Sequence, residues 1–431
     1  MSCLRQMKGA AALCACLLLC LGSAGCTYRE VPVPLPTETS AAVPTAAPAP
    51  LPTATPCPHE VWDEGVCAGC AERCAHTWEE GLCAVCGEAC SHESHDAETR
   101  RCIRCAALQR HRYAAGVCAC GAAYDFSAPS IPTELCAICP EQGTLETITY
   151  TAPDYLRQAA GDVGREWEKN IVVYLPYGYD PAKQYDLLIL MHGDGCGEKY
   201  WLQEEHEVDK GSGSFISMRN VLDNLIARRL CSEMIVACPT FYGYDADGYP
   251  HRANTSEIGV GYERELREIV LPMLAERYST YAASGSPEDL RRARDHIGYA
   301  GFSRGSIIGY GSVLTECRDM ISWIGCLSCI ADSPNYSMAY YIQGTLTDGE
   351  HDAAEYPIHL LYNGGGEDDP AWHSQKNHMN VLHQLENQLT EGENSLICPS
   401  PGRHEFKAWS KGLYDCLQLF FAYDAVTIEK S

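Results

Sequence analysis

Basic residues are scarce in this chain. Its 431 residues include 32 Lys and Arg against 57 Asp and Glu, so the formal net charge is −25. Nucleic acids and anionic membrane surfaces attract positive charge, and this balance argues against either as the main partner. We therefore predict no nucleic-acid partner and attribute the acidity to a soluble, exported protein.

The apolar stretch nearest the N-terminus is too short for an ordinary membrane-spanning helix. It covers residues 10–21, whereas a spanning helix needs about 20 apolar residues. Arg5 and Lys8 precede it, and small residues follow it, which is typical of an export signal over residues 1–26.

Cys26 ends this segment. The small residues before it resemble a bacterial lipobox, which would make Cys26 the lipid-modified N-terminus of a membrane-anchored lipoprotein, although Ser23 stands where Leu is usual. The alternative is a plain secretory signal cleaved after Gly25. Either route takes the mature protein out of the cytoplasm.

Residues 27–56 have too few large apolar side chains to form a core. They are rich in Pro, Ala and Thr, which favours an extended, partly polyproline II linker. We expect a stalk between the anchor and the folded part.

Cysteine, by contrast, is abundant and unevenly placed, with 18 of the 26 Cys before residue 140. Residues 57–139 contain a repeat in which a Cys-x-His pair is followed by a Cys-x-x-Cys pair. Three thiolates and one imidazole form a tetrahedral zinc set. The predicted ligands are Cys57, His59, Cys67, Cys70, Cys74, His76, Cys83, Cys86, Cys90, His92, Cys102 and Cys105.

Disulfides are the alternative, because small exported Cys-rich modules are usually oxidised. Disulfides do not explain the His that recurs two residues after the first Cys, so zinc is favoured. The units resemble Cys/His beads of exported Gram-positive bacterial proteins. Four protein ligands leave no open position, so we expect structural zinc in a spacer or in a module with a wall or protein partner.

A fourth copy of the repeat is degraded. Gln109 stands where the first Cys would be, and His111 leads to Cys118-Ala-Cys120 in place of Cys-x-x-Cys. No metal ligand is assigned to this copy.

Residues 141–431 have the composition of a globular enzyme. Apolar runs of strand length alternate with helical stretches, which predicts an α/β fold with a mainly parallel sheet covered on both faces. The predicted strands are residues 170–175, 185–191, 234–238, 297–302, 323–329, 358–362 and 396–398, and the predicted helices include residues 218–229, 262–278 and 409–421.

Ser303 lies in Gly-x-Ser-x-Gly, between an apolar run and a helical stretch. This is the pattern of a nucleophile elbow, where Gly301 and Gly305 remove Cβ atoms that would clash at a sharp turn. We predict Ser303 as the nucleophile. The backbone N–H groups of Arg304 and of Asp194, in the turn after the second strand, are predicted to hold the oxyanion.

In folds built around a Gly-x-Ser-x-Gly elbow, the general base follows the serine in chain order. Among the C-terminal histidines, His404 lies in the loop between the last strand and the last helix, where the base belongs. The acid should come from the loop after residues 358–362, and we choose Asp368 there. Asp369 and Glu367 are the runners-up, and Asp332 is a less favoured fourth.

Residues 143–431 resemble the esterase-D-like family of α/β-hydrolases, which includes feruloyl and acetylxylan esterases of carbohydrate esterase family one. The likeness lies in residues 173–180, 188–193, 265–278 and 299–305, and in Gly402-x-His404 with Trp409 after it. The acid loop departs from the family, because it reads Gly-Glu-Asp-Asp where Gly-Thr-x-Asp is more usual.

The resemblance implies ester hydrolysis by a Ser-His-Asp triad, with no catalytic cofactor, on acyl groups such as feruloyl or acetyl that decorate plant polysaccharide. The substrate would be a small-molecule or polysaccharide ester. The alternatives are an acyltransferase of the same fold, a non-catalytic carbohydrate-binding or adhesion protein, and a peptidase.

Overall fold

The structure of the chain is a computed structural model. It describes residues 62–63, 66–67, 78–79, 82–83, 96–104, 106, 108–155, 164–208, 212–244, 250–251, 261–330, 338–347 and 355–422. The chain divides into two units, residues 1–58 and 59–431, and every described residue belongs to the second. Within the described ranges, no helix has both the length and the apolar character to cross a membrane.

Several predicted features lie outside the described residues. They include the export signal, Cys26, the linker and Asp332. Of the predicted zinc ligands, the same applies to Cys57, His59, Cys70, Cys74, His76, Cys86, Cys90, His92 and Cys105.

An eight-stranded sheet organises the chain from residue 144 onward, with the strand order β18-β17-β16-β15-β9-β12-β8-β7. The six strands from β18 to β12 pair in parallel, while β8 is antiparallel to both β12 and β7. The mainly parallel sheet that the sequence predicts is therefore confirmed. The strands are β7 (Thr144–Pro153), β8 (Glu166–Leu175), β9 (Asp186–Met191), β12 (Met234–Cys238), β15 (Ile297–Phe302), β16 (Trp323–Leu327), β17 (Leu360–Gly366) and β18 (Ser395–Ser400).

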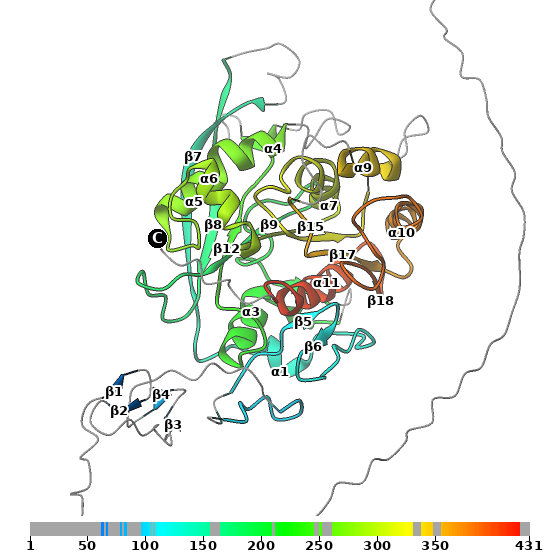
Figure 1. Cartoon of the computed structure of the whole chain (residues 1–431). Helices are drawn as coiled ribbons and strands as arrows, with labels where there is room; N and C mark the ends of the chain where they lie inside the picture. The colour runs from blue at the N-terminus through cyan, green and yellow to red at the C-terminus, as the bar shows by residue number, and fades with distance from the viewer. Residues whose placement is uncertain are drawn as a thin grey trace, which may run out of the picture. The chain divides into compact units, whose positions relative to one another are not determined.

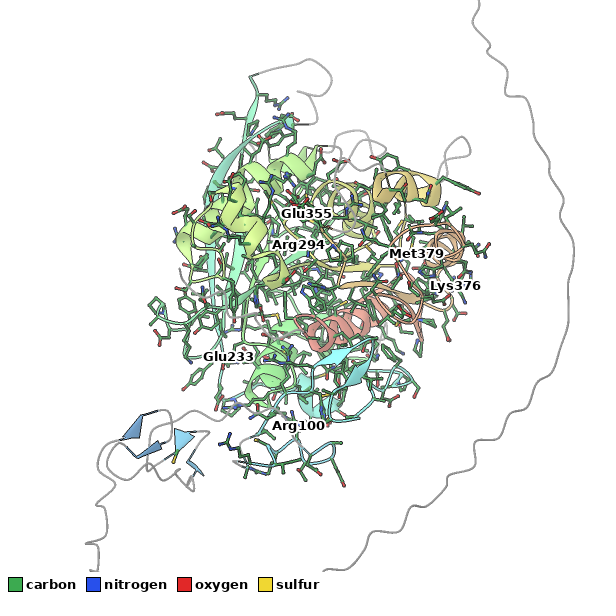
Figure 2. All side chains as sticks on the ribbon, in the orientation of Figure 1. Arg100, Glu233, Arg294, Glu355, Lys376 and Met379 are labelled. Carbon is green, nitrogen blue, oxygen red and sulfur yellow. The ribbon has the colours of Figure 1, made fainter. Side chains whose placement is uncertain are left out.

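Helices cover both faces of this sheet, because residues of the central strands alternate between two cores. In β9, Leu187 and Ile189 face one core, whereas Leu188 faces the other. Figure 1 shows α3 and α11 on one side of the sheet and α4, α5 and α9 on the opposite side. Met379 of α10, labelled in Figure 2, is buried in the second of these layers.

The helices are α1 (Thr133–Cys136), α3 (Met218–Ala227), α4 (Tyr262–Glu265), α5 (Leu271–Arg277), α6 (Pro287–Arg292), α7 (Arg304–Ile308), α8 (Leu314–Glu316), α9 (Met338–Thr347), α10 (Pro370–Leu382) and α11 (Phe406–Leu419). A π-helical turn, η1 (Leu266–Val270), joins α4 to α5, and a second, η3 (Gly309–Val313), joins α7 to α8. Together α4, η1 and α5 form the predicted helix over residues 262–278.

Three small hairpins precede the sheet, and they share one register. They are β1 (Trp62–Asp63) with β2 (Val66–Cys67), β3 (Trp78–Glu79) with β4 (Leu82–Cys83), and β5 (Tyr113–Ala114) with β6 (Val117–Cys118). In each hairpin an aromatic residue pairs with a cysteine, as Trp62 does with Cys67. The repeat seen in the sequence is therefore also a repeat of structure.

Candidate active site

Ser303 occupies the sharp turn between β15 and α7, with φ 50° and ψ −114°. A positive φ is rare for a residue with a Cβ and costs about 1–3 kcal/mol. The close packing around the turn requires glycine on both sides. A Cβ on Gly301 would lie 2.7 Å from the carbonyl carbon of Gly305, and one on Gly305 would lie 2.7 Å from the carbonyl oxygen of His192. The serine thus stands in the strained conformation of a nucleophile elbow.

His404 lies in the loop between β18 and α11, and its Nε2 is 3.0 Å from the Oγ of Ser303. The two residues are 101 positions apart in the chain. The sheet brings them together because β15 and β18 run in the same direction, so that their carboxyl ends lie on the same side of the sheet. The Trp409 indole and the imidazole pack edge to face, with ring centroids 5.0 Å apart. The sequence-predicted serine and histidine are therefore within hydrogen-bond distance.

Asp369, and not Asp368, faces the imidazole. The Nδ1 of His404 donates to the Oδ2 of Asp369 at 2.8 Å, and Asp369 is 1% exposed. Glu367 and Asp368 lie in the turn after β17 with exposed side chains. The choice of Asp368 from the sequence is corrected to the runner-up, because Asp369 is the N-cap of α10 and accepts the Ala371 N–H at 2.9 Å.

The carboxylate of Asp369 is held in its charged form. Burial acts to raise its pKa, but the hydrogen bond and the charge of His404, together with the Ala371 N–H, outweigh burial and lower the pKa below the ordinary value. A buried anion against Nδ1 fixes the imidazole tautomer with its lone pair on Nε2, toward Ser303.

The turn after β9 lies beside the elbow, because β9 and β15 are neighbouring parallel strands. It contains Asp194, and its conformation is fixed by Tyr242, whose hydroxyl accepts the Gly195 N–H at 2.8 Å and donates to the Asp194 carboxylate. Arg304 is the first residue of α7, where a backbone N–H has no intrahelical acceptor. The sequence analysis did not single out Tyr242, because one tyrosine in a loop carries no motif that predicts this positioning contact.

His192, which opens this turn, is buried and structural. Its Nδ1 donates to the Gly193 carbonyl oxygen at 2.8 Å, and its Nε2 accepts the hydroxyl of Thr240 at 2.8 Å. Burial lowers its pKa to about 4, with the Gly193 carbonyl opposing that effect. His192 is thus neutral near neutral pH and joins the end of β9 to the end of β12.

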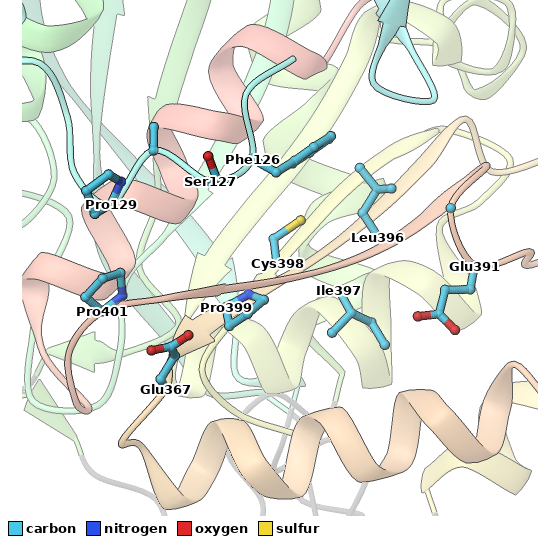
Figure 3. A pocket seen from close by; sticks show the side chains of 12 residues that line it. Phe126, Ser127, Pro129, Glu367, Glu391, Leu396, Ile397, Cys398, Pro399 and Pro401 are labelled. Carbon is cyan, nitrogen blue, oxygen red and sulfur yellow. The ribbon is translucent and has the colours of Figure 1, made fainter. Parts of the chain in front are cut away.

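A cavity of about 500 Å³ lies between residues 126–129 and the edge strand β18. Figure 3 shows Glu367 and Pro401 at one end of it and Glu391 at the other. Glu367 and Pro401 flank the loops that carry Asp369 and His404, but Ser303, His404 and Asp369 do not line this cavity. Its lining residues are Phe126, Ser127, Ala128, Pro129, Glu367, Glu391, Gly392, Leu396, Ile397, Cys398, Pro399 and Pro401.

Of the predicted zinc ligands, Cys67, Cys83 and Cys102 lie among the described residues, and Cys83 and Cys102 are buried. The structure also groups His111, Cys118 and Cys120, which the sequence analysis did not assign as ligands. The signal that could have found this group is the repeat itself, since all three residues belong to its fourth copy.

No family model matches the chain. Over 190 residues, or 44% of its length, the chain is 30% identical to endo-1,4-beta-xylanase Y of Acetivibrio thermocellus, and the chain spans 14% of that protein's length. Among solved structures, the chain is similar to the feruloyl esterase module from Clostridium thermocellum complexed with sinapinate. That match has a TM-score of 0.55 and 25% identity, and covers 68% of this chain and 93% of the module.

A ferulic acid esterase from the anaerobic fungus Anaeromyces mucronatus matches with 21% identity and a TM-score of 0.46, over 68% of this chain and 97% of that one. The likeness to the feruloyl esterase module agrees with the family resemblance that the sequence predicts. The α/β-hydrolase fold is thereby confirmed.

Proposed function

We propose that the chain is an exported serine esterase that hydrolyses carboxylic esters, with feruloyl or acetyl groups on plant polysaccharide as its substrates. The observation that carries this proposal is the continuous hydrogen-bonded chain from Ser303 through His404 to Asp369. The likeness to a feruloyl esterase module supports the substrate class.

In the proposed reaction the Oγ of Ser303 attacks the ester carbonyl carbon while Nε2 of His404 takes the hydroxyl proton. Asp369 stabilises the imidazolium that forms. The carbonyl oxygen becomes an oxyanion, which the N–H groups of Arg304 and Asp194 stabilise. His404 then returns its proton to the leaving alcohol, and water, activated by the same imidazole, hydrolyses the acyl-enzyme.

The proposal extends to where the enzyme works. The export signal, with Cys26 as lipid anchor, and the extended linker would hold the esterase outside the cytoplasm at the cell surface. Structural zinc in the Cys/His repeats would make those repeats a rigid spacer or a contact module for the wall or for another protein.

The test compares the wild type with Ser303→Ala on p-nitrophenyl acetate, methyl ferulate and acetylated xylan. We expect kcat/KM to fall by about 10⁴-fold or more, because the nucleophile is lost. Ser212→Ala, at an exposed serine in another loop, is the matched control and should keep wild-type activity.

Each outcome of this test distinguishes between the esterase hypothesis and its alternatives. The ester that the wild type turns over fastest identifies the acyl class. Acyl transfer to an added sugar in preference to water would favour the acyltransferase alternative. A wild type inactive on every ester would favour a binding protein, and full activity in Ser303→Ala would refute the assignment of the nucleophile.

A further inference from the structure

The fourth Cys/His repeat keeps the hairpin of the first two copies although its sequence has diverged. Tyr113 pairs with Cys118 across β5 and β6 in the register that joins Trp78 to Cys83. Its turn has Ala115 at φ 50° and Gly116 at φ 76°, and positive φ at both central positions is typical of a tight type I′ hairpin. The divergence has therefore changed side chains without changing the register of the hairpin.

Three side chains of this unit converge on one point. The ligand atoms of His111, Cys118 and Cys120 all lie within 4.8 Å of one another, and the His111 Nδ1 is 3.4 Å from the Cys120 Sγ. Zinc bonds of about 2.1 Å to nitrogen and 2.3 Å to sulfur, at a tetrahedral angle, put the two atoms about 3.6 Å apart. The distance between these two atoms is therefore compatible with a shared zinc ion as well as with a hydrogen bond.

The backbone holds the two thiols in place. The Cys118 N–H donates to the Ala122 carbonyl oxygen at 2.8 Å, and the Gly121 N–H donates to the Cys118 carbonyl oxygen at 2.8 Å. These bonds close a compact turn around Cys120. Cys118 and His111 are buried, and Cys120 is half-buried. The turn therefore places two thiols and one imidazole inside a small unit that has little apolar core of its own.

We propose that His111, Cys118 and Cys120 bind a structural Zn²⁺ ion, with water as the fourth ligand. Thiolate and imidazole are the ligands that zinc prefers in tetrahedral sites. This site is additional to those formed by the twelve ligands predicted from the three intact repeats, and with it the fourth copy would keep a metal-binding set in altered form.

The proposed ion would order the part of the module that contacts the catalytic domain. The Tyr113 ring lies 5.3 Å from the ring of His111 and 5.1 Å from that of Tyr124. The hydroxyl of Tyr124 donates to the Asp415 carboxylate of α11 at 2.5 Å. Arg110, next to the ligand His111, donates to the backbone carbonyl oxygen of Phe420 at 3.2 Å.

The first test is the zinc content of the full chain, purified without reducing agent. We expect His111→Ala and the double variant Cys118→Ser/Cys120→Ser each to hold one zinc ion per chain fewer than the wild type. Cys136→Ser, at a half-buried cysteine outside the cluster, is the matched control and should keep the wild-type content. Unchanged zinc content in both site variants would refute the site.

The second test uses only the wild-type chain, so it does not depend on a variant that folds. Zinc-loaded and chelator-treated protein are alkylated with iodoacetamide, and labelled cysteines are located by mass spectrometry. We expect Cys120 to be protected by zinc and labelled after chelation, whereas labelling of Cys136, which is similarly half-buried, should not change. Equal labelling of Cys120 in both samples, or a disulfide between Cys118 and Cys120, would overturn the proposal.

Discussion

Asp369 accepts hydrogen bonds from two directions, from the imidazole of His404 and from the first turn of α10. Its pKa is lowered, because the effects of His404 and of the Ala371 N–H exceed the effect of burial. A carboxylate fixed at both oxygens can orient an imidazole, whereas an exposed carboxylate such as that of Asp368 turns freely in water.

We therefore predict that Asp369→Asn lowers kcat by about 10⁴-fold with little change in fold, because the amide favours the wrong imidazole tautomer. Asp368→Asn, one position earlier in the same loop, should stay near wild-type activity. Steady-state kinetics on p-nitrophenyl acetate measure both. A larger loss in Asp368→Asn than in Asp369→Asn would contradict the geometry.

The sequence marks Ser303 and His404 by their place relative to strands and helices, and the structure puts the two side chains within hydrogen-bond distance. Their catalytic roles stay predictions. The sequence was not sufficient to select the carboxylate that faces His404. Neighbouring residues at the end of a strand point in different directions, and the direction depends on where α10 begins. Asp-Pro at residues 369–370 was the available signal, since Asp is a preferred N-cap and Pro a preferred first helical residue.

At the scale of elements, the ends of β9 and β12 are joined by the neutral imidazole of His192, which contacts Thr240. Burial lowers the pKa of His192 to about 4, whereas a histidine in an unfolded chain has a pKa of about 6.5. The unfolded chain therefore binds the proton more tightly. The contribution of His192 to stability is complete above about pH 6.5 and is lost as the pH falls toward about 4.

We predict that the free energy of unfolding falls by about 3 kcal/mol over this window through His192 alone, an order-of-magnitude figure from the difference in pKa. Urea unfolding at several pH values measures it. His192→Gln should be less stable at pH 7 but should show a shallower decline toward pH 4 than the wild type. His378→Gln, at a half-buried position on α10, should keep the wild-type slope, and identical slopes in all three proteins would contradict the assignment.

The elements themselves were predictable to different degrees. The bounds of β15 follow from the sequence because a fully buried strand reads as one apolar run that ends at the glycine-flanked serine. The edge strand β7 was missed although Thr alternates in it with the buried Ile148, Tyr150 and Ala152, which is the period-two signal of a half-buried strand. Helix α9 was also missed, although it buries Ile342 and Leu346, because its sequence lacks clear start and stop residues.

At the scale of the whole described unit, residues 108–139 pack against the catalytic domain through α11. Asp415 of this helix is buried, and burial raises its pKa while Lys411 opposes that effect. Its carboxylate accepts from Lys411 at 2.7 Å, from Tyr362 at 2.7 Å and from Tyr124. Sequence patterns do not predict the contact between Tyr124 and Asp415, because the two residues lie about 290 positions apart. The domain boundary near residue 140 stays a prediction.

Tyr124 thus connects the repeat module to the helix that follows the catalytic loop. We predict that Tyr124→Phe lowers the free energy of unfolding by about 1–2 kcal/mol, because the buried Asp415 loses one of its donors and keeps the other two. Tyr177→Phe, at a tyrosine that is 60% exposed, should change it by less than about 0.5 kcal/mol. Urea unfolding at pH 7 measures both variants.

Since α11 begins two residues after His404, a looser module would first increase the mobility of the loop that carries His404, so kcat should fall only modestly in Tyr124→Phe. Equal stability of the two variants would mean that the module contributes nothing to the catalytic domain through this bond.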